Sequence, residues 1–451
     1  MFRPPVNHAM RTLDRTFFRK VIPISAARIT DNKNIGEIRQ QLSKTNELLR
    51  LLRVTEVQRD PEVSLAERDV KCLLLQPEVR HDDTSTWSSK IHEYVNAAKV
   101  HLIPFDLTLD YNYWTYHDIM NAILPEDALE EVPSGYSLVG HIAHLNLREQ
   151  YLPYKTLIAT VLLDKIPNVK TVINKTDDVG AESEYRTFGF EVLAGDPNLE
   201  VEVTEEECRF RFDYSEVYWN PRLQTEHRRL VAMFAEGDAV CDVMAGVGPF
   251  AVPAGKKHVF VWANDLNPAS HSSLRDAINR NKVSKFVRAF NLDGQQFIRT
   301  SARLLLEETE KGSPIVSLTE KQPRHRPVGT SKPKVIAQFT LPRTFHHYVM
   351  NLPDSAITFL KAFIGLYKGQ EKLFEPHTKT TLPMIHVHCF STEGDDAADE
   401  RAICRRISER IGYTIEPTMP ETVIWDVRSV SPKKKMFCAS FRLPPEVAFQ
   451  R

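Results

Sequence analysis

The chain has 451 residues, of which 42% are hydrophobic and 26% are charged. This balance excludes a mainly disordered or fibrous protein and leaves room for two or three globular domains. The 58 basic and 59 acidic residues give a net charge of -1, so a polyanionic partner would have to bind a local basic surface. No run of 18 apolar residues occurs, and we therefore expect no membrane span.

The six cysteines lie far apart and lack the spacing of a metal site, so we expect no metal and a reducing compartment. The first 30 residues hold six basic side chains and one acid without an apolar core. This composition is typical of a mitochondrial transit segment, and a basic surface of the folded protein has the same composition.

Apolar residues recur at helical spacing between residues 34 and 53, which predicts an amphipathic helix there. Strands and short helices are expected to follow as far as the linker-like stretch PEDALEEVPSGY. We predict one domain over residues 1-132 and an α+β connecting domain over residues 133-220.

After residue 220, apolar runs alternate with helical stretches, which predicts βαβ units and a parallel sheet covered on both faces. The five runs are AVCDVM, VFVWAND, FVRAFNLD, HHYVMNLP and MIHVHCF. Two later runs, TVIWDVRSV and MFCASFRL, predict a closing antiparallel pair. Residues 221-451 are thus expected to form an α/β, Rossmann-like domain. Its segment at about 306-334, rich in Pro, Ser, Thr and charge, is predicted to be a flexible insertion.

A glycine turn follows the first of these strands in CDVMAGVGPFAVPAG. Gly246 and Gly248 begin a G-x-G-x-x-A pattern, and Asp265 follows Gly246 by 19 residues at the end of the next strand. The glycines let the backbone approach a ligand, and the carboxylate suits ribose hydroxyls. Both a dinucleotide and S-adenosylmethionine fit this pattern.

Three further residues favour S-adenosylmethionine. Pro249 removes an amide that a pyrophosphate would use. Asp242, at the end of the first strand, suits the cationic methionine end and would repel a pyrophosphate. Asp293 ends the third strand and can approach an adenine amino group. Each carboxylate can equally cap a turn, but together they favour the methyl donor.

Asn351 begins the motif NLP at the carboxyl end of the fourth strand, beside the expected cofactor crevice. Its amide can both donate and accept hydrogen bonds, which suits the edge of a nucleobase. The alternative is an Asn cap on a helix that begins near Asp354.

These motifs closely resemble those of the archaeal and eukaryotic tRNA (guanine-N1)-methyltransferases that modify guanosine at tRNA position 37. The resemblance covers nearly the whole chain apart from the insertion and the extreme termini. It also rests on FRPPVNHAMRTLDRTFF, GYSLVGHIAHLNLREQYLPYKTLIATVLLDK, YRTFGFEVLAGD and VYWNPRLQTEHRR. It implies a class I S-adenosylmethionine-dependent methyltransferase domain preceded by smaller α+β RNA-binding domains, the first of which grips the tRNA.

The resemblance also implies partners and a location. The expected partner is a tRNA with guanosine at position 37, and the chain is expected to act as a monomer without membrane attachment. Family members are expected in the cytoplasm, and also in the nucleus and mitochondrial matrix.

Matching motifs assign expected roles around the target base. Glu226 would accept the N1 proton, although alone it resembles an exposed helix start. Arg186 would hydrogen-bond to the guanine carbonyl oxygen, Tyr218 would stack on the base, and Asn351 would hold its edge. The expected cofactor residues are Asp242, Gly246, Gly248, Asp265, Asp293 and Asn351. His386 and His388 share a strand face and lack a third ligand, so core packing is the preferred interpretation.

Three alternatives remain at this point. The related tRNA-wybutosine enzymes transfer an aminocarboxypropyl group from the same cofactor, but they alter the NLP motif. An NAD-linked dehydrogenase is supported only by the glycine pattern. A non-catalytic RNA-binding protein would not require Asp265, Glu226 and Asn351 together.

Overall fold

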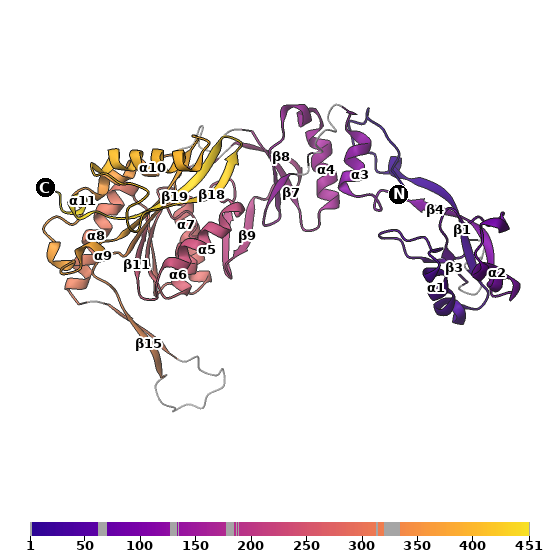
Figure 1. The fold of residues 1–451 in the computed structure, drawn as a ribbon, viewed down its shortest axis with the longest axis horizontal. Helices are drawn as coiled ribbons and strands as arrows, with labels where there is room; N and C mark the ends of the chain where they lie inside the picture. The colour runs from indigo at the N-terminus through magenta and orange to yellow at the C-terminus, as the bar shows by residue number, and fades with distance from the viewer. Residues whose placement is uncertain are drawn as a thin grey trace. The chain divides into compact units, whose positions relative to one another are not determined.

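The computed structural model describes residues 2–61, 70–126, 133, 135–176, 185, 187, 189–312, 314–319 and 334–450. The chain forms two compact units, each built from separate segments of sequence (Figure 1). The first unit comprises Met1–Gly135, Leu147–Asn168 and Leu193–Gly195, and the second comprises Tyr136–Asn146, Val169–Val192 and Asp196–Arg451. The three-domain division at residues 132 and 220 stays a prediction.

A four-stranded antiparallel sheet forms the centre of the first unit, with strand order β2-β3-β1-β4. Its strands are β1 (Lys20–Ile29), β2 (Val57–Arg59), β3 (Lys71–Leu74) and β4 (Val100–Leu109). The helices of this unit are α1 (Ile35–Lys44), α2 (Ser89–Asn96), α3 (Tyr116–Ile123) and α4 (Lys155–Lys165). β1 and β4 pair along all ten residues, and α1 buries Ile38 and Leu42 in the core beside the sheet.

The helix predicted over residues 34–53 is wrong beyond Lys44. Asn46 has a positive φ of 56°, a left-handed conformation that ends a helix. The chain then runs extended, and Leu48 bridges Leu75 in antiparallel fashion. Leu48 and Leu49 are buried. The apolar spacing therefore indicated buried residues correctly, but the helical conformation predicted for them is wrong.

The second unit begins with two small sheets. One has the order β5-β6-β7-β8, and the other pairs β9 with β10. Their bounds are β5 (Tyr136–Val139), β6 (Ile142–Leu145), β7 (Thr171–Lys175), β8 (Phe190–Gly195), β9 (Glu200–Glu205) and β10 (Cys208–Asp213). The last three residues of β8 are counted with the first unit. Phe210 and Phe212 of β10 pack on Trp219. These rings join the pair to the main core of the unit.

A seven-stranded sheet with the order β13-β12-β11-β16-β17-β19-β18 forms the rest of the second unit. Its strands are β11 (Ala239–Asp242), β12 (Phe260–Asn264), β13 (Val287–Phe290), β16 (His347–Met350), β17 (Met384–Ser391), β18 (Val423–Ser431) and β19 (Lys434–Arg442). The first five in spatial order are parallel, and β19 and β18 run antiparallel. The predicted Rossmann-like sheet and its closing antiparallel pair are confirmed.

Helices connect these strands and begin where capping residues favour them. Asn267 caps α7 with Pro268 at its first position, and Asp293 caps α8, both favourable choices for a helix start. The helices are α5 (Gln224–Met233), α6 (Ala251–Lys256), α7 (Pro268–Arg280), α8 (Gly294–Glu310), α9 (Thr378–Thr381), α10 (Asp396–Ile411) and α11 (Pro445–Ala448). Within the described ranges, no helix of either unit has the length and apolarity to cross a membrane.

The predicted flexible insertion differs from the structure at both ends. α8 continues to Glu310, and β14 (Ile315–Thr319) pairs antiparallel with β15 (Val335–Thr340). Figure 1 shows β15 extending outward from the seven-stranded sheet. Residues 320–333 lie outside the described residues. The sequence pattern missed the hairpin because Pro, Ser and charged residues surround its short apolar strands.

Candidate active site

A pocket lies at the carboxyl ends of the parallel strands, the usual place for a ligand in an open α/β sheet. Among the described residues, most of its lining comes from the end of β12 and the segments after β11, β12, β13 and β16, and Tyr185 and Tyr218 come from earlier in the chain. It consists of Tyr185, Tyr218, Val243, Met244, Gly246, Asn264, Asp265, Leu266, Asn267, Ser270, Asp293, Gly294, Asn351, Leu352 and Phe359. Five of the predicted site residues therefore meet in one pocket although the sequence separates them widely.

The glycine turn holds a conformation that side chains disfavour. Gly246 has φ 56° and Gly248 has φ 97°, both in the left-handed region that favours glycine. A Cβ on Gly248 would lie 2.7 Å from Leu274 Cδ1 and 3.0 Å from Val252 Cγ2, whereas one on Gly246 would meet nothing within 4 Å. Gly248 thus allows the loop to pack on α7, and Gly246 leaves open space in the pocket.

Asp265 ties this turn to the next strand. Its Oδ2 accepts a hydrogen bond from the Gly246 amide at 2.8 Å, and its Oδ1 accepts one from the Asn267 amide at 3.0 Å. Burial raises the pKa of Asp265 in spite of these donors. The Ser270 side chain also donates to Asp265. A carboxylate offers about four acceptor positions, so Asp265 keeps room for a further donor, and its expected contact with the ribose hydroxyls stays a prediction.

Asn264 fixes the strand ends around the pocket, a role that sequence reasoning missed. Its side chain is fully buried. Nδ2 donates to Val243 O at 3.1 Å and to Leu292 O at 2.9 Å, and Oδ1 accepts from the Leu292 amide at 2.9 Å. One amide therefore joins the loops after β11, β12 and β13. The only available signal was its place directly before Asp265.

Asp242 is the most unusual carboxyl group of the site. It is fully buried, and neither of its oxygens has a hydrogen-bond partner among the described residues. Burial and the nearby charge of Asp265 raise the pKa of Asp242 to about 8. An unpartnered buried carboxyl is costly unless a ligand pairs with it. Asp242 is not among the described residues that line the pocket, so its expected contact with the ammonium group of S-adenosylmethionine stays a prediction.

Asp293 both caps α8 and lines the pocket. Its Oδ1 accepts from the Gln295 and Gln296 amides, each at 3.0 Å. The capping alternative considered from the sequence is thus observed, and the contact with an adenine amino group stays a prediction.

Asn351 and Tyr218 also line the pocket. Asn351 Oδ1 is buried without a hydrogen-bond partner among the described residues, and its expected contact with a base edge stays a prediction. Tyr218 receives a hydrogen bond from Asn220 Nδ2 at 3.3 Å. Arg186 lies outside the described residues, and its expected contact with the base stays a prediction.

Glu226 occupies a different environment from the other predicted residues. It is 2% exposed and is not among the described residues that line the pocket. Arg229 donates from Nε to Oε2 at 2.7 Å and from Nη2 to Oε1 at 2.8 Å. His388 Nε2 donates to Oε1 at 2.9 Å. The exposed helix start that the sequence suggested is thus a buried, fully bonded carboxylate.

These contacts keep Glu226 ionised. Burial alone would raise its pKa, but the hydrogen bonds from Arg229 and His388 outweigh burial and lower the pKa to about 2. Possible ligand atoms of Glu226, His388 and Cys438 lie within 4.8 Å of one another. The guanidinium of Arg229 already neutralises the carboxylate, which makes this cluster a poor cation site.

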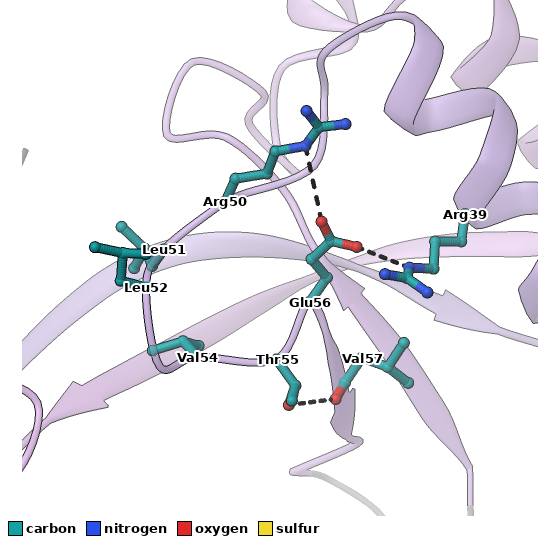
Figure 2. A pocket seen from close by; sticks show the side chains of 8 residues that line it. All are labelled: Arg39, Arg50, Leu51, Leu52, Val54, Thr55, Glu56 and Val57. Atoms are coloured by element: carbon teal, nitrogen blue, oxygen red, sulfur yellow. Dashed lines mark hydrogen bonds and ion pairs between the residues drawn. The ribbon is translucent and has the colours of Figure 1, made fainter. Parts of the chain in front are cut away.

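A larger hollow of about 630 Å³ lies in the first unit, compared with about 130 Å³ for the pocket at the strand ends. Figure 2 shows Glu56 between Arg39 and Arg50, with N···O distances of 2.8 and 3.8 Å. The carboxylate partly neutralises both cations, and most of the remaining lining is aliphatic. None of the predicted site residues lies there, so chemistry rather than size identifies the active-site pocket.

Comparisons with known proteins identify the family and the fold of the chain. The TYW2 N-terminal domain model matches residues 116–198, and the TRM5/TYW2 methyltransferase domain model matches residues 201–313. Two solved structures share the fold. Trm5b from Pyrococcus abyssi has a TM-score of 0.55 at 20% identity and covers 93% of this chain and 99% of its own. A complex of aTrm5 and tRNALeu has a TM-score of 0.58 at 19% identity and covers 93% and 100%.

A curated relative is far closer in sequence. The tRNA (guanine(37)-N(1))-methyltransferase of Aspergillus fumigatus is 55% identical over 466 residues, which cover 100% of this chain and 96% of that protein. On this identity across its whole length, the chain belongs to the tRNA (guanine(37)-N(1))-methyltransferase family.

Proposed function

We propose that this protein transfers a methyl group from S-adenosylmethionine to N1 of guanosine 37 in tRNA. The observation that carries the proposal is the pocket where Asn351 and Tyr218 meet the glycine turn and Asp265. Family membership supports the reaction, and the aTrm5–tRNALeu complex, which shares the fold, supports tRNA as the partner.

The cofactor side of the pocket matches the donor group by group. Asp242 would pair with the ammonium group, Asp265 would accept from the ribose hydroxyls, and Asp293 would face the adenine amino group. Gly246 and Gly248 allow the backbone to approach. When bound, S-adenosylmethionine supplies an activated methyl group whose bonding electrons remain on sulfur as the methyl leaves.

The substrate side matches a base edge that carries donors. Guanine presents N1–H and an amino group on that edge, and the unpartnered Asn351 Oδ1 can accept from either. Tyr218 would stack on the flipped base, and Arg186 would stabilise negative charge on the carbonyl oxygen. Flipping costs roughly a few kcal/mol, so contacts elsewhere on the tRNA must contribute binding energy.

The N1 proton needs an acceptor, because N1 gains a bond to carbon as the proton leaves. We assign this role to Glu226, whose ionised carboxylate is already held in place. Its oxygens accept from Arg229 and His388, so one of these contacts must lengthen when the proton arrives. The methyl group thus replaces the proton on the same nitrogen.

The decisive experiment compares two tRNA transcripts that differ only in guanosine or adenosine at position 37. Labelled methyl should appear on the guanosine transcript alone and map to N1. Label on both transcripts, or on neither while the cofactor binds, would overturn the proposal. The mass of the modified nucleoside also separates methyl transfer from aminocarboxypropyl transfer, the second candidate, which the shared TRM5/TYW2 domain model keeps open.

We also propose that the protein acts as a monomer in the cytoplasm, with nuclear and mitochondrial pools. The basic character of the first 30 residues supports a mitochondrial pool. Light scattering with bound tRNA tests the oligomeric state, and fractionation of cells that express the tagged chain tests the location.

A further inference from the structure

His388 lies at the centre of a buried polar cluster that sequence analysis interpreted as core packing. It belongs to β17, which pairs with β19 through His388 and Cys438. Glu226 reaches the cluster from α5, 162 positions earlier in the chain. Both Glu226 and His388 are almost completely buried, with side-chain exposures of 1% and 0%. Hydrophobic packing does not explain why two polar side chains are buried in contact with each other.

The position of His388 connects Glu226 with the pocket. Met350, the last residue of β16, pairs with Val387 of β17, so Asn351, the next residue, comes level with His388. Asn351 lines the pocket, and His388 contacts Glu226. His388 is thus next in register to the residue expected to hold the base and in direct contact with the residue expected to take its proton.

Arg229 and His388 hold Glu226 in different ways. The Arg229 side chain is 21% exposed, and its guanidinium lies 5.1 Å from the centre of the exposed Trp425 ring. His388 is fixed within a sheet and has no exposed atoms. Burial would lower the pKa of His388, but Cys438 and Glu226 raise it to about 10. Because the ionised Glu226 carboxylate can only accept, His388 Nε2 carries the hydrogen in this contact.

We propose that His388 is a positioning residue for the methyl-transfer reaction, and that its Nε2–H holds the Glu226 carboxylate in the orientation from which it accepts the N1 proton. This inference rests on the proposed function. The charged or titratable groups around the contact are Arg229 on α5, Cys438 on β19, His386 on β17 and Asp242 on β11.

The chain offers a matched control in His386. It lies on the same strand and face as His388 and is equally buried. Its contacts are Ser440 Oγ at 2.8 Å and His347 at 3.0 Å, without Glu226. His388→Leu and His386→Leu each remove a buried imidazole. Only the first removes a donor to Glu226.

The test measures single-turnover methyl transfer to the guanosine-37 transcript under saturating substrates. We expect His388→Leu to lower the rate about ten- to hundredfold, the size expected for losing one hydrogen bond to a charged group. The KM for tRNA and the Kd for S-adenosylmethionine should stay near wild type. His388→Gln, which keeps an N–H donor, should recover most of the rate, and His386→Leu should lose little.

A double-mutant cycle with Glu226→Gln shows whether His388 acts through Glu226. His388→Leu should cause little further loss once Glu226→Gln is present. Equal rate losses in His388→Leu and His386→Leu, or independent effects in the cycle, would overturn the positioning role. A fully active Glu226→Gln variant would likewise overturn it, because Glu226 would not be the proton acceptor. A wild-type protein without activity on the transcript would instead overturn the proposed function, so the two failures are distinct.

Discussion

Replacing Asp242 by Asn should stabilise the ligand-free protein and weaken its binding of S-adenosylmethionine. Asp242 is fully buried, and both its oxygens lack partners among the described residues. The substitution keeps the shape of the side chain and removes its charge. In the ligand-free protein, burying that charge lowers the free energy of unfolding. In the bound protein we expect it to pair with the ammonium group.

The magnitude follows from the pKa of Asp242, which burial raises from 3.8 to about 8. Because the folded pKa lies above the unfolded value, the folded state takes up a proton that the unfolded state lacks between these pH values. Stability therefore falls as pH rises through this window and levels off above about pH 8. At pH 7 the cost is on the order of 4 kcal/mol, since each pH unit above 3.8 contributes about 1.4 kcal/mol.

Calorimetry at several pH values from 5 to 9 tests this reasoning. The transition that shifts on addition of S-adenosylmethionine identifies unfolding of the seven-stranded sheet. The gain in the free energy of unfolding from Asp242→Asn should grow with pH up to about 8 and then stay constant. The variant should bind S-adenosylmethionine more weakly than the wild type. Asp293→Asn is the control for the stability measurement alone, because that carboxyl group is exposed at the same edge and caps a helix, where Asn is equally suitable.

A gain that does not depend on pH would refute the assignment of the cost to the Asp242 charge. A loss of stability at every pH would show that the carboxylate has partners in the free protein. Unchanged cofactor affinity would remove Asp242 from the binding site.

Three further predictions concern the surrounding framework. Gly248→Ala should destabilise the second unit by about 1–3 kcal/mol through overpacking against Leu274 and Val252. Gly246→Ala, whose new Cβ meets no neighbour, should cost only about 1–2 kcal/mol through backbone strain. If calorimetry finds Gly246→Ala to be more destabilising than Gly248→Ala, the steric argument is contradicted. Asn264→Ala should lower the free energy of unfolding by about 2–4 kcal/mol, because it leaves Val243 O and Leu292 O without their donor. Cofactor titration should also show weaker binding. Unchanged affinity would mean that the Asn264 hydrogen bonds do not shape the pocket. Asp164→Asn should lower the unfolding midpoint of the first unit, because it removes the negative charge and one of the two oxygens that accept from Arg15 and Tyr111. Since Arg15 is half exposed, we expect a loss of about 1 kcal/mol or less. A large loss would mean that the tyrosine contact dominates.

The parallel sheet was predictable because its strands are buried on both faces. Continuous apolar runs such as the one ending at Asp242 leave no alternative that buries them equally well. The end of α1 was not predictable from spacing alone. Leu49 and Leu52 continue the helical period, but Asn46 turns the chain, and only contacts with Leu75 and its neighbours make that turn favourable.

The pocket was partly predictable for the same reason. Strand ends gather at one edge of a parallel sheet, which brings Asp265, Asp293 and Asn351 together. The surroundings of Glu226 were not predictable, because His388 approaches from 162 residues away and its own sequence neighbours indicate only a core strand. Long-range polar contacts leave no periodic signal in a single sequence.

The interleaved segments of the two units restrict how the protein can be divided. The first unit needs α4, where Asp164 joins Arg15 and Tyr111, yet α4 follows Tyr136–Asn146, which belongs to the second unit. A ribosome therefore delivers the start of the second unit before the first is complete. A truncation at Gly135 removes α4 from the first unit, and no single cut yields both units whole. An insertion or fusion that respects both units must instead be placed at the exposed tips of loops, such as the turn between β18 and β19.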